Sequence, residues 1–220
     1  MLERRLRNIL SVPFIFRFNS GFGSLKYLEF FSGGQLTSKP SRWHELGPFT
    51  VFDVETTGMS PVNDRIVEIA AIRVDIDGIH SRFHSLVKPG IRIPDEVIRI
   101  HRITNEMVGK SPSFPNVGKD FMAFVQDSIL VAHNGRFDLA FLQESLSRHG
   151  IALWNGRTMD SITIIRHAYP GLPSYSLQNL QRHFSLGTGD GQAHRAFTDV
   201  EWTLEIFGMS MQRLLDADKK

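Results

Sequence analysis

Three apolar segments separated by short polar turns open the folded part of the chain. Residues 48–54 form an almost continuous apolar run, and residues 65–75 and 79–89 alternate in part between apolar and polar positions, as strands do. Asp77-Gly78, between the last two segments, is a residue pair common in hairpin turns. The pattern therefore predicts three consecutive strands that form an antiparallel meander.

After Pro94 the apolar residues take helical spacing. Residues 114–127 and 136–150 place apolar side chains three and four positions apart, and Gly150 is a frequent helix terminator. Residues 128–134 lie between them as a short apolar run, which predicts a fourth strand that leads directly into a helix. Further helical segments are expected at residues 94–104, 105–110, 161–168, 174–184 and 196–215, with a strand or turn near residues 157–160.

This order of elements predicts the fold class and the domain boundaries. A meander followed by helix, strand and helix indicates an α/β protein with a mixed five-stranded sheet, its antiparallel meander flanked by helices. Residues 32–48 are rich in Gly, Ser and Pro, which is typical of a linker. We therefore expect a basic N-terminal arm and linker at residues 1–47 and a single domain at residues 48–215.

Charge is distributed unevenly between these two parts. Residues 1–48 hold seven of the 25 Lys and Arg and three of the 23 Asp and Glu, so residues 49–220 hold 18 and 20, a net charge of −2. A body of that charge does not hold a polyanion by bulk attraction. Any nucleic acid must therefore be bound by local contacts or through metal ions.

The sequence contains no cysteine and no long apolar run. Without Cys there is no disulfide and no thiolate zinc site, which favours a reducing compartment, the cytoplasm. No run of 18 or more apolar residues predicts a membrane-spanning helix. Residues 1–20 are rich in Arg and partly apolar, as transit peptides and membrane-surface helices are, but Pro13 and Arg17 interrupt the apolar run and no small-residue cleavage site follows. We favour an arm that packs on the domain or on a partner.

Two carboxylates, Asp53 and Glu55, lie where the first predicted strand ends. Side chains alternate along a strand, so residues two apart point to the same face. Two adjacent carboxylates repel unless a cation neutralises them, and Mg²⁺ or Mn²⁺ is the usual ion for oxygen ligands. A bare Asp-x-Glu is more often a helix cap next to a solvated charge, so a metal site here depends on further acids.

Two further acids and a histidine lie at positions where they could complete such a metal site. Asp138 lies one turn into the helix after the fourth strand, where it would face the strand end; the plain alternative is a first-turn Asp that interacts with the helix dipole. Asp199 lies on the last long helix, with His194 five residues earlier. In a continuous helix that spacing places the two side chains about 140° apart. His194 can therefore share a site with Asp199 only from a loop or the first turn, which the three glycines within residues 187–191 permit.

In order and context, these residues resemble the DnaQ-like DEDDh 3′–5′ exonucleases, the family that includes the epsilon proofreading subunit of bacterial DNA polymerase III. The three motifs of that family are present as FDVETTG (52–58), HNGRFD (133–138) and HRAFTD (194–199). The resemblance covers about residues 48–208. It implies a ribonuclease H-like, DnaQ-like exonuclease fold.

The resemblance also implies a mechanism. Asp53, Glu55, Asp138 and Asp199 would hold two divalent ions, Mg²⁺ or Mn²⁺, with Asp53 shared by both, and His194 would activate water. Two ions about 3.5–4 Å apart can clamp a phosphodiester, and an imidazole with a pKa near 6.5 can take the proton of the water at neutral pH. The expected reaction is metal-dependent release of 5′-mononucleotides from 3′ ends, most of all from single-stranded DNA, in proofreading or repair.

The turn after Glu55 is the expected seat of the terminal nucleotide. Gly58 is expected to permit the sharp exit from the strand, and donors near Thr56 are implied to meet the 3′-OH. Arg102 replaces the usual glycine of the family, which adds a candidate phosphate contact. The resemblance assigns the nucleotide site to Thr56, Thr57, Gly58, Met59, Ile100, His101, His133, Asn134 and Phe137; for Met59, Ile100 and Phe137 the alternative is core packing.

Two alternative functions stay open. One is an RNA 3′ exonuclease of the RNase T or oligoribonuclease kind, although DVETTG differs from the Leu-Glu-Met pattern more usual in oligoribonucleases. The other is a non-catalytic nucleic-acid-binding module, against which the complete set of four acids and a histidine argues, because idle clustered carboxylates cost stability. The expected partners are single-stranded nucleic-acid 3′ ends and a DNA polymerase or another replication or repair protein, with no membrane.

Overall fold

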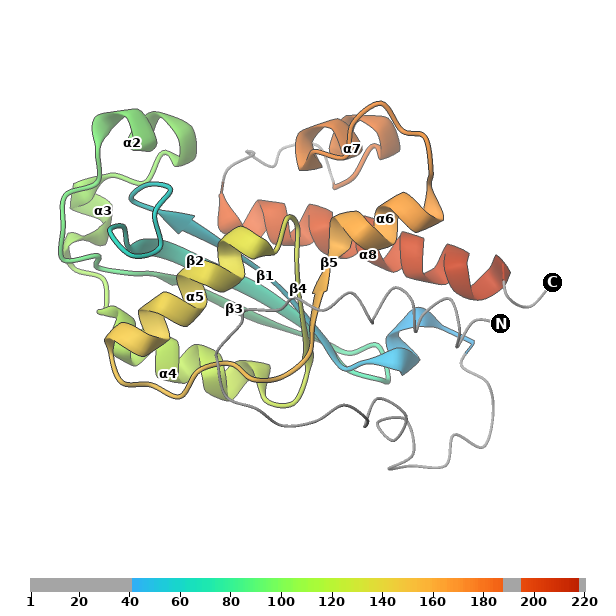
Figure 1. Ribbon diagram of the computed structural model, residues 1–220, viewed down its shortest axis with the longest axis horizontal. Coiled ribbons are helices and arrows are strands. Elements are labelled where there is room, and N and C mark those ends of the chain that lie inside the picture. Colours follow the sequence, from blue (N-terminus) through green and yellow to red (C-terminus); the bar gives the residue numbers. More distant parts are fainter. Residues whose placement is uncertain (1–40, 188–194, 218–220) are drawn as a thin grey trace, which may run out of the picture.

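A five-stranded sheet forms the centre of the protein. The computed structural model describes residues 41–187 and 195–217, and within them the strands are arranged in the order β3-β2-β1-β4-β5 (Figure 1). The first three strands pair antiparallel, whereas β4 pairs parallel with β1 and β5 parallel with β4. The predicted mixed sheet with an antiparallel meander is confirmed. The strands are β1 (Phe49–Thr56), β2 (Ile66–Val74), β3 (His80–Leu86), β4 (Ile129–Ala132) and β5 (Thr158–Asp160).

The helices follow the sequence prediction closely in number and place. Each predicted helical segment contains one observed helix, and the ends differ by a few residues. The helices are α2 (Asp95–His101), α3 (Asn105–Gly109), α4 (Phe114–Val125), α5 (Arg136–Arg148), α6 (Ser161–Ala168), α7 (Leu177–Phe184) and α8 (Ala196–Ala217), preceded by a short 3-10 helix, η1 (Trp43–Leu46).

Helices cover both faces of the sheet, so that β1 is buried on each side (Figure 1). Phe52 and Val54 of β1 pack on the side of α4 and α5, with Phe121 and Phe141. The alternate residue Val51 packs on the side of α6 and α8. This alternation along β1 is what places Asp53 and Glu55 on the α8 side, where the apolar layer ends.

Residues 43–46 are part of the packed unit, although the sequence assigned them to the linker. The Trp43 ring lies 5.6 Å from the ring of Phe49 and 5.7 Å from that of Phe207, between centroids. The Trp43 amide also donates to Gln212 Oε1 at 3.1 Å. An aromatic residue within a polar stretch is sufficient to attach this segment to α8. Most of the predicted arm, residues 1–40, lies outside the described residues.

Within the ranges that the structure describes, no helix combines the length and the apolar character needed to cross a membrane.

Helix α2 ends at His101 because the next residue leaves the helical conformation. Arg102 caps the helix with φ 64° and ψ 12°, the left-handed region that glycine adopts at little cost. A side chain in this region costs about 1–2 kcal/mol. Arg102 therefore has a backbone conformation that favours glycine, although it carries a long side chain.

We predict that Arg102→Gly raises the free energy of unfolding by about 0.5–1 kcal/mol, since relief of the left-handed strain exceeds the added entropy of the unfolded chain. Urea denaturation of the two proteins measures this difference. Lys110 is the matched control, because it caps α3 with φ −105°. Lys110→Gly should lower stability by about 0.5 kcal/mol. A loss of stability in Arg102→Gly would contradict the strain.

Candidate active site

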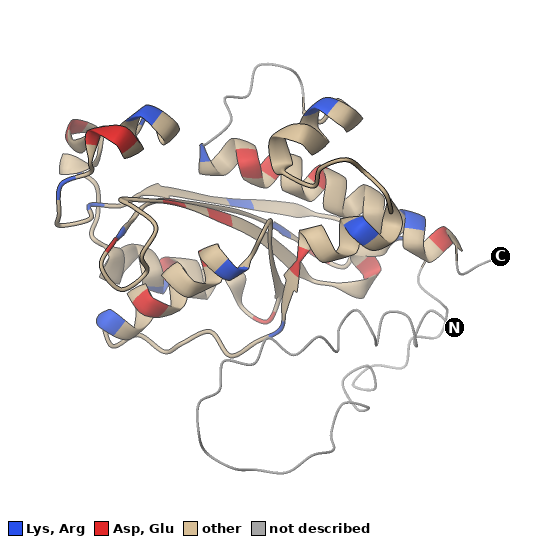
Figure 2. Ribbon diagram, turned by 45° about the horizontal axis from the view of Figure 1, so that its top comes forward, with Lys and Arg blue, Asp and Glu red and all other residues tan. Residues whose placement is uncertain are grey.

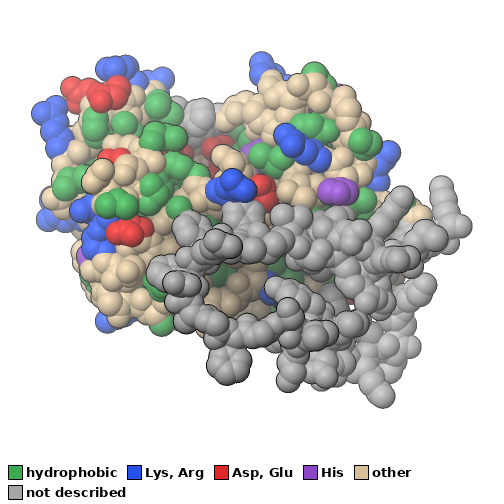
Figure 3. Space-filling model, in the orientation of Figure 1, with side chains coloured by type: hydrophobic (Ala, Val, Ile, Leu, Met, Phe, Trp, Pro, Cys, Tyr) green, Lys and Arg blue, Asp and Glu red, His purple; other side chains and the backbone are tan. Residues whose placement is uncertain are grey.

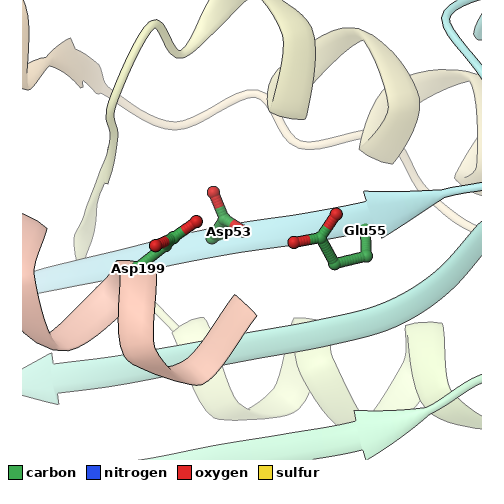
Figure 4. Close-up of side chains that lie close together, drawn as sticks. All are labelled: Asp53, Glu55 and Asp199. Carbon is green, nitrogen blue, oxygen red and sulfur yellow. The ribbon is translucent and has the colours of Figure 1, made fainter. Parts of the chain in front are cut away.

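Three carboxylates from two elements meet beside the end of β1. Asp53 and Glu55 come from the strand and Asp199 from the first turn of α8, and one ligand oxygen of each lies within 4.8 Å of the others. Figure 4 shows the three side chains directed into one space between strand and helix. The expectation that Asp53 and Glu55 share a face is confirmed. Oxygen ligands at this spacing suit Mg²⁺ or Mn²⁺.

Packing of α8 on the sheet brings Asp199 to this place. Ala196 and Val200 are fully buried on the α8 side of the sheet, in the same cluster as Val51. Asp199 lies between them in the sequence and is 6% exposed. A carboxylate in the first turn is also stabilised by the positive end of the helix dipole. The position of Asp199 is therefore fixed by the apolar packing of α8 on the sheet.

Asp138 reaches β1 from the other side, at the edge of the strand. β4 pairs with β1 only over residues 49–51, so the later part of that edge is open to α5. Asp138 is 3% exposed, and its Oδ1 accepts a hydrogen bond from the Val54 amide at 3.1 Å. The prediction that Asp138 faces the strand end agrees with this contact. Asp138 lies beside the three clustered carboxylates and is not a member of that cluster.

The electrostatics of the cluster are those of crowded negative charge. Burial and then the charges of Asp138 and Glu55 raise the pKa of Asp53 well above its usual range. Burial and then Asp199 raise the pKa of Glu55 to about 8. Burial raises the pKa of Asp138 to about 7, against the opposing hydrogen bond from Val54. The carboxylates therefore hold protons near neutral pH unless a cation replaces them, which is the property of a metal site.

A fifth acid, Glu68, lies next to the cluster and was not predicted from the sequence. It stands opposite Glu55 in the β1–β2 pairing and is fully buried. Burial opposes its ionisation, but hydrogen bonds from His84, Arg195 and the Ala196 amide outweigh that effect and lower its pKa to about 2. One feature of the sequence could have indicated Glu68. It is an acid within the apolar strand VEIAAIRV, where a buried charge needs a partner.

The turn after Glu55 is held by its own side chains. The Thr56 hydroxyl donates to the Gly58 carbonyl at 2.6 Å, and the Thr57 hydroxyl donates to Asp64 Oδ1 at 3.1 Å. Asp64 Oδ2 accepts from the Ser60 amide at 2.9 Å. A Cβ at Gly58 would lie 2.5 Å from Asp64 Oδ2, so a side chain there would displace the Asp64 carboxylate from its contacts with Thr57 and Ser60. The φ of Gly58 is not in the left-handed region, so the expected conformational reason is replaced by a steric one.

Two of the predicted nucleotide contacts use their ring nitrogens inside the protein. His101 is 1% exposed; its Nδ1 accepts from the Ile103 amide at 2.9 Å, and its Nε2 lies 3.3 Å from the Thr56 carbonyl. His133 Nδ1 lies 2.8 Å from Ser161 Oγ and Nε2 lies 2.9 Å from the Tyr175 carbonyl. Burial lowers the pKa of His133. Both histidine rings are therefore held in place by contacts within the protein, and their contact with a nucleotide stays a prediction.

Other predicted nucleotide contacts differ in exposure. Met59 is 80% exposed and Ile100 is 55% exposed, so core packing, the alternative for both, does not apply. The Phe137 ring lies 4.8 Å from the Phe141 ring, between centroids and tilted by 47°, and packs against the core. Asn134 is exposed in the turn between β4 and α5. Its φ is 61°, and its backbone amide donates a hydrogen bond to Asp160 Oδ1.

The site lies in a hollow between two lobes. Figure 3 shows acidic atoms on the floor of a hollow that separates the lobe of α2 from that of α7. Lys and Arg are spread over α2, α5, α6 and α7 and do not gather on one of them (Figure 2). The predicted base, His194, lies outside the described residues. The residue after it, Arg195, is described, and its carbonyl accepts a hydrogen bond from the Asp199 amide.

Comparison with known proteins identifies relatives over most of the chain. The family described as Exonuclease matches residues 50–207. The DNA polymerase III subunit epsilon of Treponema pallidum (strain Nichols) is 39% identical over 166 residues, covering 74% of this chain and 76% of that protein. The DNA polymerase III PolC-type of Clostridium perfringens (strain 13 / Type A) is 37% identical over 166 residues, covering 76% of this chain but 11% of that protein.

A solved structure shows the same fold. Exonuclease X in complex with 5′ overhanging duplex DNA has a TM-score of 0.56 and 27% sequence identity, and the match covers 78% of this chain and 93% of that chain. The predicted ribonuclease H-like, DnaQ-like exonuclease fold is confirmed.

We predict that, in EDTA, stability falls as pH rises from about 4.5 to about 8, because the folded protein holds the Glu55 proton more tightly than the unfolded chain does. Thermal unfolding midpoints across this range measure the effect. Mg²⁺ should raise the midpoint more at pH 8 than at pH 5, where it competes with protons.

Glu55→Gln should flatten this pH dependence, since the amide does not titrate. Glu96→Gln, an exposed change on α2, is the control. A pH dependence that Glu55→Gln leaves intact would contradict the assignment of the effect to this carboxylate.

Proposed function

The chain belongs to the exonuclease family, and from this premise we propose that it releases 5′-mononucleotides from the 3′ ends of DNA in a reaction that depends on two divalent ions. The observation that carries the proposal is the cluster of Asp53, Glu55 and Asp199, whose ligand oxygens lie within 4.8 Å of one another. Buried carboxylates with raised pKa values are stable in the ionised form when a cation is bound. We assign this activity to the domain at residues 48–215 together with the helix that precedes it, η1 (Trp43–Leu46).

The acids have separate tasks in this proposal. Asp53, Glu55 and Asp199 would hold the ions directly, and Asp138 would complete the set from the edge of β1. Divalent ions supply charge neutralisation of the phosphodiester and a lowered pKa of attacking water. His194 is proposed to accept the proton of that water, for which an imidazole near its ordinary pKa is suited at neutral pH.

The turn at residues 56–59 is proposed to receive the terminal nucleotide. Its hydroxyls are engaged internally, so its conformation exists before the substrate arrives. The exposed side chains Met59 and Ile100 offer apolar surface on which an unpaired base can rest. Thr56, Thr57 and Gly58 then act through backbone and shape, while His101 and His133 support them. Arg102, exposed after α2, is a proposed phosphate contact.

Single-stranded DNA is the favoured substrate in this proposal, and RNA is the alternative. The relatives include subunits of DNA polymerase III, and the structural relative was solved with DNA. These similarities also support a DNA polymerase, or another replication or repair protein, as a proposed partner.

We predict that Asp53→Asn lowers the rate of 3′ shortening of a 5′-labelled single-stranded DNA in Mg²⁺ by about 10³-fold or more, because the carboxylate common to both ions is lost. Gel analysis of the time course measures the rate, and an RNA of the same sequence in parallel measures sugar preference. Asp120→Asn, an exposed change on α4, should retain wild-type activity. Stepwise shortening that is equally fast in Asp53→Asn would refute the mechanism.

His194→Ala should lower the same rate by about 10²–10⁴-fold while the fold and metal binding persist, since only the proton acceptor is removed. The loss should shrink as pH rises and hydroxide replaces the missing base. Rate against pH from 6 to 9 for the variant and wild type measures this. Parallel pH profiles for the two proteins would argue against a general base at this position.

A further inference from the structure

We propose that Glu68 is a positioning residue for this reaction: by binding Arg195 and the Ala196 amide, it fixes the first turn of α8 and so holds Asp199 in the acidic cluster. This inference rests on the proposed function of the cluster. It concerns a residue outside the set expected to bind the ions.

Glu68 uses both carboxylate oxygens in contacts with four donors. Oε1 accepts from Arg195 Nη2 at 2.8 Å and lies 2.8 Å from His84 Nε2. Oε2 accepts from Arg195 Nε at 3.3 Å and from the Ala196 amide at 3.0 Å. The contact with Arg195 is therefore two-pronged, the geometry in which an Arg-carboxylate pair is strongest. Sequence separations of 127 and 128 residues show that the contact joins β2 directly to the start of α8.

The backbone of Arg195 links this contact to Asp199. The Arg195 carbonyl accepts a hydrogen bond from the Asp199 amide at 3.1 Å. Glu68 thus fixes the side chain of Arg195, while the backbone of Arg195 fixes the amide of Asp199. Because the Glu68 side chain is wholly buried, it has no alternative partner in water. Any shift of this turn would leave a buried charge uncompensated, which is costly.

A second contact layer from β3 supports the same turn. The Phe197 ring lies 6.0 Å from the His84 ring between centroids, and the Arg82 guanidinium carbon lies 5.2 Å from the centroid of Phe197. Arg82 also pairs with Glu201, one turn further along α8, at 3.4 Å. The start of α8 is therefore attached to two neighbouring strands.

The experiment measures Mn²⁺ binding to the full chain by isothermal titration calorimetry, alongside kcat and KM on single-stranded DNA. We expect Glu68→Gln to raise the Mn²⁺ dissociation constant and to lower kcat, each by about 10–100-fold, the usual effect of losing a group that orients a metal ligand. KM for the oligonucleotide should not change, because Glu68 does not touch substrate. A merely structural residue would lower Tm without this separation of kcat from KM.

Asp75→Asn is the matched control, since Asp75 pairs with Arg73 at 2.9 Å at the other end of β2. It should leave Mn²⁺ affinity and kcat at wild-type values. Arg195→Lys is the second variant in case Glu68→Gln does not fold: its site is partly exposed, and lysine keeps the charge but not the two-pronged contact. We expect about a 3–10-fold loss of Mn²⁺ affinity from this milder change.

Wild-type Mn²⁺ affinity in a folded Glu68→Gln, or in Arg195→Lys, would overturn the inference. So would loss of Mn²⁺ binding as complete as in Asp53→Asn, because Glu68 would then be a ligand. The proposed function fails separately, if wild type and Asp53→Asn are equally inactive on every nucleic acid tested.

Discussion

Repulsion among carboxylates at the end of β1 is the constraint on which the rest of the structure depends. Asp53, Glu55 and Asp199 are brought within 4.8 Å by a strand and a helix that are both fixed by buried apolar contacts. Packing on both elements keeps these side chains out of water, and burial, followed by the charges of the neighbouring acids, raises the pKa values of Asp53 and Glu55. A close-packed interior that resists relaxation is what keeps three ordinary acids together in a group that could hold a metal ion.

Glu55 and Glu68 show how much the partners of an acid matter. They are the same residue type, opposite each other on adjacent strands. Glu55 has like charges around it and a pKa raised to about 8, whereas Glu68 has donors around it and a pKa lowered to about 2. Burial opposes ionisation in both, and the number of donors decides the outcome. The arrangement supplies one acid ready for a cation and another already committed to holding α8.

Several residues that look like substrate contacts are part of the support of the site. His101 and His133 use both ring nitrogens within the protein. Thr57 and Asp64 tie the two ends of the turn after β1, and Gly58 leaves room for the Asp64 carboxylate in that contact. Rigid support of this kind pre-forms the geometry in which a reacting group must be held. Met59, Ile100 and Asn134 are the exposed members of the predicted nucleotide site.

The sequence by itself determined the order of strands and helices, the shared face of Asp53 and Glu55 and the position of Asp138 at the strand end, because periodicity and turn chemistry act over a few residues. It left the predicted linker too long, since one Trp43 contact with Phe207 outweighs local composition. Only the tertiary structure decided that Glu68 holds Arg195 and that His101 faces the Thr56 carbonyl. Those contacts join residues 127 and 45 positions apart, and they exist only once the start of α8 has packed on β2 and the end of α2 has packed beside the end of β1.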